Sequence, residues 1–130
     1  MREDTLNRLT EGIAAFNRGD LDGMLAPIHP DIHFQPLRAV LEGEVYEGHE
    51  GFRRWLGDMA EDWEDFHLEL LGVRALGDER VLVEAKIHAR ARTSGVQMDG
   101  PGAWLCDLRD DLIVNLRFFR DAESALAAAG

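Results

Sequence analysis

Apolar residues recur at helical spacing near the start of the chain. A helix is predicted over residues 5–17, where four apolar side chains share one face: Leu6, Leu9, Ile13 and Phe16. Gly19 ends this helix, and Asp20 is a natural N-cap for a short second helix, which Pro27 and Pro30 confine.

Two further helices are predicted from the same spacing. One begins at His49 and ends near the acidic residues 61–65, and its apolar positions are Phe52, Trp55, Leu56 and Met59. The other covers residues 122–129 and closes the chain. The segment 37–48 is less regular, and its glycines predict either a loop or a ragged hairpin.

Alternation of apolar and polar residues dominates the second half of the chain. It is strictest over residues 80–92, where six apolar residues alternate with charged ones. Strands are predicted over residues 31–36, 66–76, 80–92, 103–109 and 112–120, with a connection over 95–102. Helices followed by an antiparallel meander predict an α+β fold, in which a curved sheet wraps around the helical layer.

Composition limits the possible partners. The 130 residues, 45% of them hydrophobic, are predicted to form a single domain over residues 1–130. The net charge of −11 repels phosphate backbones and anionic lipids, so we expect neither a nucleic acid nor a membrane as partner. Cys106 is the only cysteine, and "MREDTLNRL" lacks the apolar core of a signal peptide, which together predict a cytoplasmic location.

Four separated segments carry a family resemblance: "FNRGDLDGMLAPIHPDIHF", "YEGHEGFRRWL", "RDDLIVNLRFFRD" and "AESALAAAG". Their order and spacing resemble the SnoaL-like branch of the NTF2-like (nuclear transport factor 2-like, ketosteroid isomerase-like) superfamily over essentially the whole chain. The resemblance implies a cone-shaped α+β fold with a cavity between sheet and helices, and a homodimer formed through the sheet. It does not imply one chemistry, because the superfamily includes ketosteroid isomerases, polyketide cyclases, epoxide hydrolases and proteins that only bind ligands.

The catalytic positions of these relatives hold unsuitable residues here. The resemblance aligns the isomerases' donor tyrosine with Gly12, their carboxylate base with Pro36 and their second acid with about Ala103. The aspartate of the SnoaL-type cyclases falls near Phe118. None of these four side chains can move a proton, so the usual isomerase and cyclase mechanisms are not expected.

The resemblance and the strand period together predict a cavity lining. The candidate lining residues are Gly12, Phe16, Phe34, Pro36, Trp55, Met59, Ala103, Leu116, Phe118 and Arg120. Arg120 is the one charge among them, and it either holds an anionic ligand group at the mouth or pairs with Asp121 or Asp31. For the apolar members, plain core packing is the commoner reason for burial.

Three rim residues are the candidates for acid–base chemistry: His33, Tyr46 and Arg120. No metal is expected, because His29 and His33 have no convergent third ligand. No nucleotide-binding loop occurs either, so no cofactor is expected. On the outer sheet face, the period places an aromatic and arginine mixture typical of an interface, which also predicts a homodimer: Trp104, Cys106, Arg117, Phe119, His88 and Arg90.

Two classes of function follow. The first is a protein that binds a small apolar molecule in the cavity. The second is an isomerase, polyketide-cyclase-like enzyme or hydrolase that uses the rim residues His33, Tyr46 and Arg120. We favour the first, because the usual catalytic positions hold residues that cannot transfer a proton.

Overall fold

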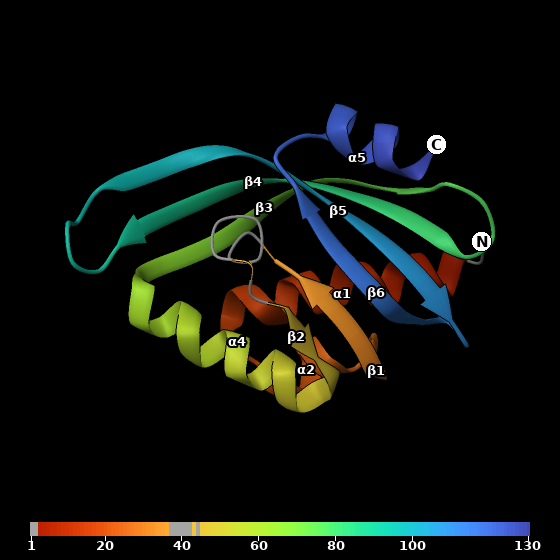
Figure 1. Ribbon diagram of the computed structural model, residues 1–130, viewed down its shortest axis with the longest axis horizontal. Coiled ribbons are helices and arrows are strands. Elements are labelled where there is room, and N and C mark those ends of the chain that lie inside the picture. Colours follow the sequence, from red (N-terminus) through yellow and green to blue (C-terminus); the bar gives the residue numbers. More distant parts are fainter. Residues whose placement is uncertain (1–2, 37–42, 44) are drawn as a thin grey trace.

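The computed structural model of this protein describes residues 3–36, 43 and 45–130, and these residues form four helices and six strands (Figure 1). In chain order the elements are α1 (Glu3–Arg18), α2 (Leu21–Leu25), β1 (Ile28–Gln35), β2 (Tyr46–Glu47), α4 (Gly48–Asp62), β3 (Trp63–Ala75), β4 (Arg80–Ala91), β5 (Gln97–Arg109), β6 (Leu112–Phe119) and α5 (Ala122–Ala129). None of the described helices is both long enough and apolar enough to cross a membrane.

The helix ends follow the local signals in the sequence. Gly19 adopts a positive φ of 74° after α1, a conformation that glycine adopts without steric cost. Asp20 caps α2 as predicted, because its carboxylate accepts a hydrogen bond from the Gly23 N–H at 3.1 Å. Asp121 caps α5 in the same way through the Ser124 N–H at 2.8 Å. Both carboxyl groups have a lowered pKa, chiefly because of these backbone hydrogen bonds.

The strands form one six-stranded sheet in the order β2-β1-β6-β5-β4-β3, and the predicted α+β class is confirmed. Neighbouring strands are antiparallel except β1 and β6, which run parallel. The parallel pair arises because the chain leaves β1, crosses to the far edge through α4, and returns strand by strand until β6 lies beside β1. The sheet was predicted to be antiparallel, and it is antiparallel in every pair except β1 and β6.

The strand β5 starts earlier than the sequence predicted. Residues 95–102 were expected to be a connection because they contain Gly100, Pro101 and Gly102, yet β5 begins at Gln97 and pairs with β4 from that residue onward. Pairing with β6 starts only at Ala103. Pro101 therefore lies in a stretch of β5 with a single neighbouring strand, where a missing N–H is tolerated.

Helices lie on both sides of the sheet (Figure 1). The curved sheet wraps over α1, α2 and α4, whereas α5 lies on the opposite face. Beneath α5 a small cluster joins Leu82, Ala103 and Ala125. Most of the irregular segment 37–48 lies outside the described residues, and its described end forms β2 and the first residue of α4.

Candidate functional site

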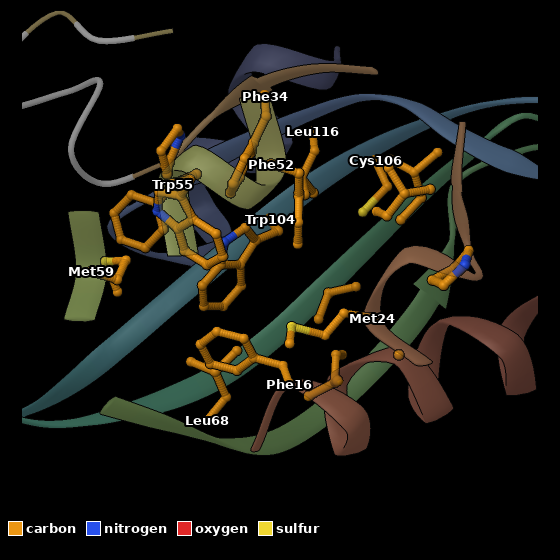
Figure 2. A pocket seen from close by; sticks show the side chains of 18 of the residues that line it. Phe16, Met24, Phe34, Phe52, Trp55, Met59, Leu68, Trp104, Cys106 and Leu116 are labelled. Carbon is orange, nitrogen blue, oxygen red and sulfur yellow. The ribbon is translucent and has the colours of Figure 1, made fainter. Parts of the chain in front are cut away.

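A cavity of about 190 Å³ lies between the concave sheet face and the helices α1, α2 and α4. Eight aromatic residues from both layers line it: Phe16, Phe34, Phe52, Trp55, Trp63, Phe66, Trp104 and Phe118. The helical periodicity of α1 and α4 and the alternation of the strands turn these side chains toward a common space. Figure 2 shows the labelled members of this wall converging from helices and strands.

The aromatic wall is organised around Trp55. Its indole stacks on Phe16 with ring centroids 5.7 Å apart and meets Phe34 edge to face at 4.9 Å. Phe52 packs against it at 5.3 Å. On the opposite wall, Trp104 and Phe118 form a second edge-to-face pair at 5.4 Å. Such pairs hold each ring in a defined orientation, so the wall is a shaped apolar surface.

Polar groups in the wall are few. Among the described lining residues only Asp62 carries a charge, and it is exposed at the end of α4. Burial raises the pKa of the Cys106 thiol to about 12, so this group stays protonated at neutral pH. The buried indole N–H of Trp55 has no hydrogen-bond partner among the described residues. The wall residues that the structure describes therefore include no acid–base pair of the kind that proton transfer requires.

The structure brings together eight of the ten predicted lining residues: Gly12, Phe16, Phe34, Pro36, Trp55, Met59, Leu116 and Phe118. Ala103 is a correction, because it lies on the other face of the sheet with Leu82 and Ala125, under α5. Arg120 is a second correction. Its side chain is 87% exposed and lies 3.8 Å from the Asp121 carboxylate, outside the cavity wall.

The placement of Trp104 and Cys106 on the outer face was also wrong. Both residues line the cavity, since the inward side of β5 carries its even-numbered residues. The outer side carries Ala103 and Asp107, whose carboxylate accepts a hydrogen bond from Arg80 at 2.7 Å. A charged pair keeps access to water on this convex face, which fixes the strand's orientation.

The predicted rim residues are not brought to the cavity. His33 is half-exposed on the side of β1 opposite Phe34, and its ring lies 3.3 Å from the Glu47 carboxylate. Tyr46 is fully buried, and its hydroxyl donates a hydrogen bond to Asp58 at 2.6 Å, while the Arg54 guanidinium lies over its ring. Neither residue belongs to the cavity wall.

Comparison with known proteins agrees with this geometry. Residues 9–116 match the SnoaL-like domain family. The chain belongs to the SnoaL-like family.

Solved structures share the same fold over nearly the whole SnoaL-like chain. An NTF2-like protein of unknown function from Burkholderia pseudomallei has a TM-score of 0.81 and 18% identity, covering 97% of each chain. A Xanthomonas campestris protein, named provisionally as a polyketide cyclase, has a TM-score of 0.78 and 24% identity, covering 99% of this chain and 98% of its own. A Catenulispora acidiphila protein with a ketosteroid isomerase-like fold, solved with trimethylamine, has a TM-score of 0.75 and 19% identity, covering 92% of this chain and 89% of its own. The comparison with curated proteins found no match.

Within this SnoaL-like domain, the described residues contain no group of three or more His, Cys, Asp or Glu side chains arranged to hold a metal ion. The wall instead offers aromatic surface, flexible thioethers at Met24 and Met59, and few hydrogen-bonding groups.

Proposed function

We propose that this SnoaL-like protein binds a small, uncharged, apolar molecule in the cavity between its sheet and helices. The observation that carries the proposal is the cavity itself, about 190 Å³ in volume and lined almost wholly by aromatic and aliphatic side chains. A cavity of about 150 Å³ with a comparable lining is known to take up benzene in another protein. The volume is therefore sufficient for an aromatic ring.

The charge of the wall argues against an anionic ligand. The wall provides no cation among its described residues, and its one charged member is the Asp62 carboxylate. A carboxylate ligand would lose its hydration in an apolar cavity without gaining a partner, which is strongly unfavourable. The net charge of −11 adds repulsion during the approach of an anion.

The positions of the three candidate residues do not support the alternative function, an isomerase, cyclase or hydrolase that uses rim residues. Proton transfer needs a group within hydrogen-bonding reach of the substrate. His33, Tyr46 and Arg120 all lie outside the cavity wall, and each already lies beside a carboxylate. The apolar wall thus supports binding without supporting this route to catalysis.

The test combines native mass spectrometry of freshly purified protein with a titration by naphthalene. Mass spectrometry shows whether a small molecule is retained, and denaturing release identifies it. Calorimetry with naphthalene is expected to show saturable binding with one site per chain. The substitution Leu116→Trp places an indole in the cavity and is expected to weaken naphthalene binding about tenfold or more.

The matched control is Leu71→Trp, the same chemical change at a β3 residue that is 61% exposed and outside the wall. This control should bind naphthalene as the parent protein does. Equal naphthalene affinity in the two variants, or no saturable binding by the parent protein, would contradict the proposal.

The homodimer predicted from the family resemblance rests on the outer sheet face. That face retains His88, Arg90, Arg117 and Phe119 after Trp104 and Cys106 are assigned to the cavity. Arg117 lies over the Phe119 ring at 5.5 Å, an arrangement compatible with an interface core. Sedimentation as a monomer at micromolar concentration would refute the dimer.

A further inference from the structure

One stretch of β5 has a free backbone edge. β4 pairs with β5 along its whole length, whereas β6 pairs only with the later part, so residues 97–102 have no second neighbour among the described strands. The hydrogen bond from the Ala91 N–H to the Val96 carbonyl, at 3.0 Å, sets the alternation of this ladder. The N–H and C=O groups of Gln97 and Asp99 therefore point away from β4, toward the free edge.

The same stretch exposes apolar side chains. Val96 is 57% exposed and Met98 is 46% exposed, and the alternation places both on the concave side of the sheet. Phe66 lies in the same row as Met98, with Ala89 between them in the register. Figure 1 shows the hairpin of β4 and β5 projecting past α4 at the left of the view. An exposed strand edge beside apolar side chains is a site at which another strand pairs.

The outer edge of the sheet, at β3, is protected in a way that this stretch is not. The Asn17 side chain donates a hydrogen bond to the Leu68 carbonyl at 2.7 Å and accepts one from the Leu68 N–H at 2.9 Å. The register of β3 is also interrupted by a bulge at residues 70–72. Covering groups and bulges are devices that prevent pairing at an edge. Within the described chain, no side chain caps the backbone of Gln97 or Asp99 in this way.

We propose that the free edge of β5 pairs in antiparallel orientation with the same edge of a second copy of this chain, about a two-fold axis at Met98. In this register Gln97 lies opposite Asp99 of the second copy, and the symmetry repeats the pair. Each pair exchanges both of its backbone hydrogen bonds, so the two sheets become continuous. Met98 packs against its own counterpart on the concave side. This contact is separate from the ligand cavity and from a dimer formed through the sheet face.

Charge and hydrogen bonding favour this register over the one centred on Asp99. On the outer face Arg90 lies beside Gln97, so the Asp99 carboxylate of the second copy approaches Arg90 across one residue, with the backbones about 10 Å apart. Centring on Asp99 would oppose two carboxylates directly, which destabilises a strand pair. It would also place Pro101, which lacks an N–H, opposite Gln97. The edge is thus complementary to itself, and a second copy is the occupant that it fits.

Cysteine cross-linking tests both the contact and its register. Met98→Cys places a thiol at the two-fold axis, where opposed Cα atoms are about 4.5 Å apart, within the range of a disulfide. Val96→Cys is the matched control on the same face, because its two copies lie about 13 Å apart. With copper phenanthroline as oxidant, we expect the first variant to form covalent dimers about tenfold faster or more. Cys106 is buried and protonated, so it does not compete.

Amide hydrogen exchange in the unmodified protein is the second measurement. The N–H groups of Gln97 and Asp99 should exchange at least about threefold more slowly at 1 mM than at 10 µM protein, because pairing protects them. The Met98 N–H, already bonded to β4, should exchange equally at both concentrations. A dimer formed only through the sheet face protects neither amide. Equal cross-linking of the two variants, or exchange at Gln97 and Asp99 that is independent of concentration, would overturn the proposal.

Discussion

The buried thiol of Cys106 gives a quantitative test of how closed the cavity wall is. Burial raises the pKa of this group from 9.0 to about 12. At pH 8 the thiolate fraction is therefore about one in ten thousand in the folded protein, against about one in ten for an exposed thiol with the ordinary pKa. Because the thiolate is the reactive form, we expect the native protein to react about a thousand times more slowly than the unfolded chain.

The assay follows the release of chromophore from dithionitrobenzoate at pH 8, with and without urea. Cys106 is the only cysteine, so the signal reports one site per chain without correction. Because Cys106 lines the cavity, saturation with naphthalene should slow the native reaction further. A native rate within tenfold of the unfolded rate would refute the reasoning, since the thiol would then be accessible and ionisable in the folded state.

The same pKa shift predicts how stability depends on alkaline pH. The unfolded thiol ionises from about pH 9, whereas the folded thiol remains protonated up to about pH 12, so unfolding releases a proton in this window. The free energy of unfolding should therefore fall by about 1.4 kcal/mol per pH unit relative to a Cys106→Ala variant, which lacks the group. Urea unfolding at pH 8, 10 and 11 measures the difference, and parallel curves for the two proteins would contradict it.

Two further predictions concern the sheet. Gly102→Ala would place a Cβ atom 2.9 Å from Ile87 and 3.0 Å from Phe118, so we expect this variant to be about 1–3 kcal/mol less stable and to bind naphthalene more weakly. The control Gly100→Ala has open space around the added Cβ atom and should change neither property. Equal urea midpoints for the two variants would contradict this prediction. The imidazolium of His88 donates hydrogen bonds to the carboxylates of Asp99 and Glu69, which raises the pKa of His88. Its stabilising contribution should therefore be complete below about pH 6.5 and be lost as pH rises through the raised pKa. Titration of the ring by nuclear magnetic resonance measures this pKa, and a value at or below 6.5 would refute the prediction.

Most of the secondary structure was accessible from the sequence because its signals are local. The helix from Glu3 to Arg18 follows from one apolar stripe and a terminal glycine, and α5 has the predicted bounds Ala122–Ala129. The early start of β5 was missed because the stretch 97–102 contains Gly and Pro, which usually mark a loop. Long-range pairing with β4 overrode that local preference.

The cavity lining was predicted in outline, with errors on strand β5 and at Arg120. The even-numbered residues of β5 face inward. The sequence contained a signal for this orientation, because Asp107 and Arg109 lie on the same side of the strand as Ala103. Burying these two charges in an apolar interior would be energetically costly. The N–H of Trp55, which has no partner within the described part of the chain, could not be predicted in the same way. Whether this N–H is paired depends on which side chains surround the indole, and periodicity alone does not identify those neighbours.

Packing at Gly12 leaves little room for a side chain at this position of the cavity wall. A Cβ atom at Gly12 would lie 2.8 Å from Cγ of the rigid Pro27 ring. Pro27 is held in place because its carbonyl accepts a hydrogen bond from the Ile113 N–H at 2.8 Å, which ties this residue to β6. A tyrosine at position 12, the residue that the isomerase resemblance calls for, would therefore collide with the Pro27 ring unless α1 moved. The close approach of α1 to Pro27 therefore explains why a glycine occupies this position of the cavity wall.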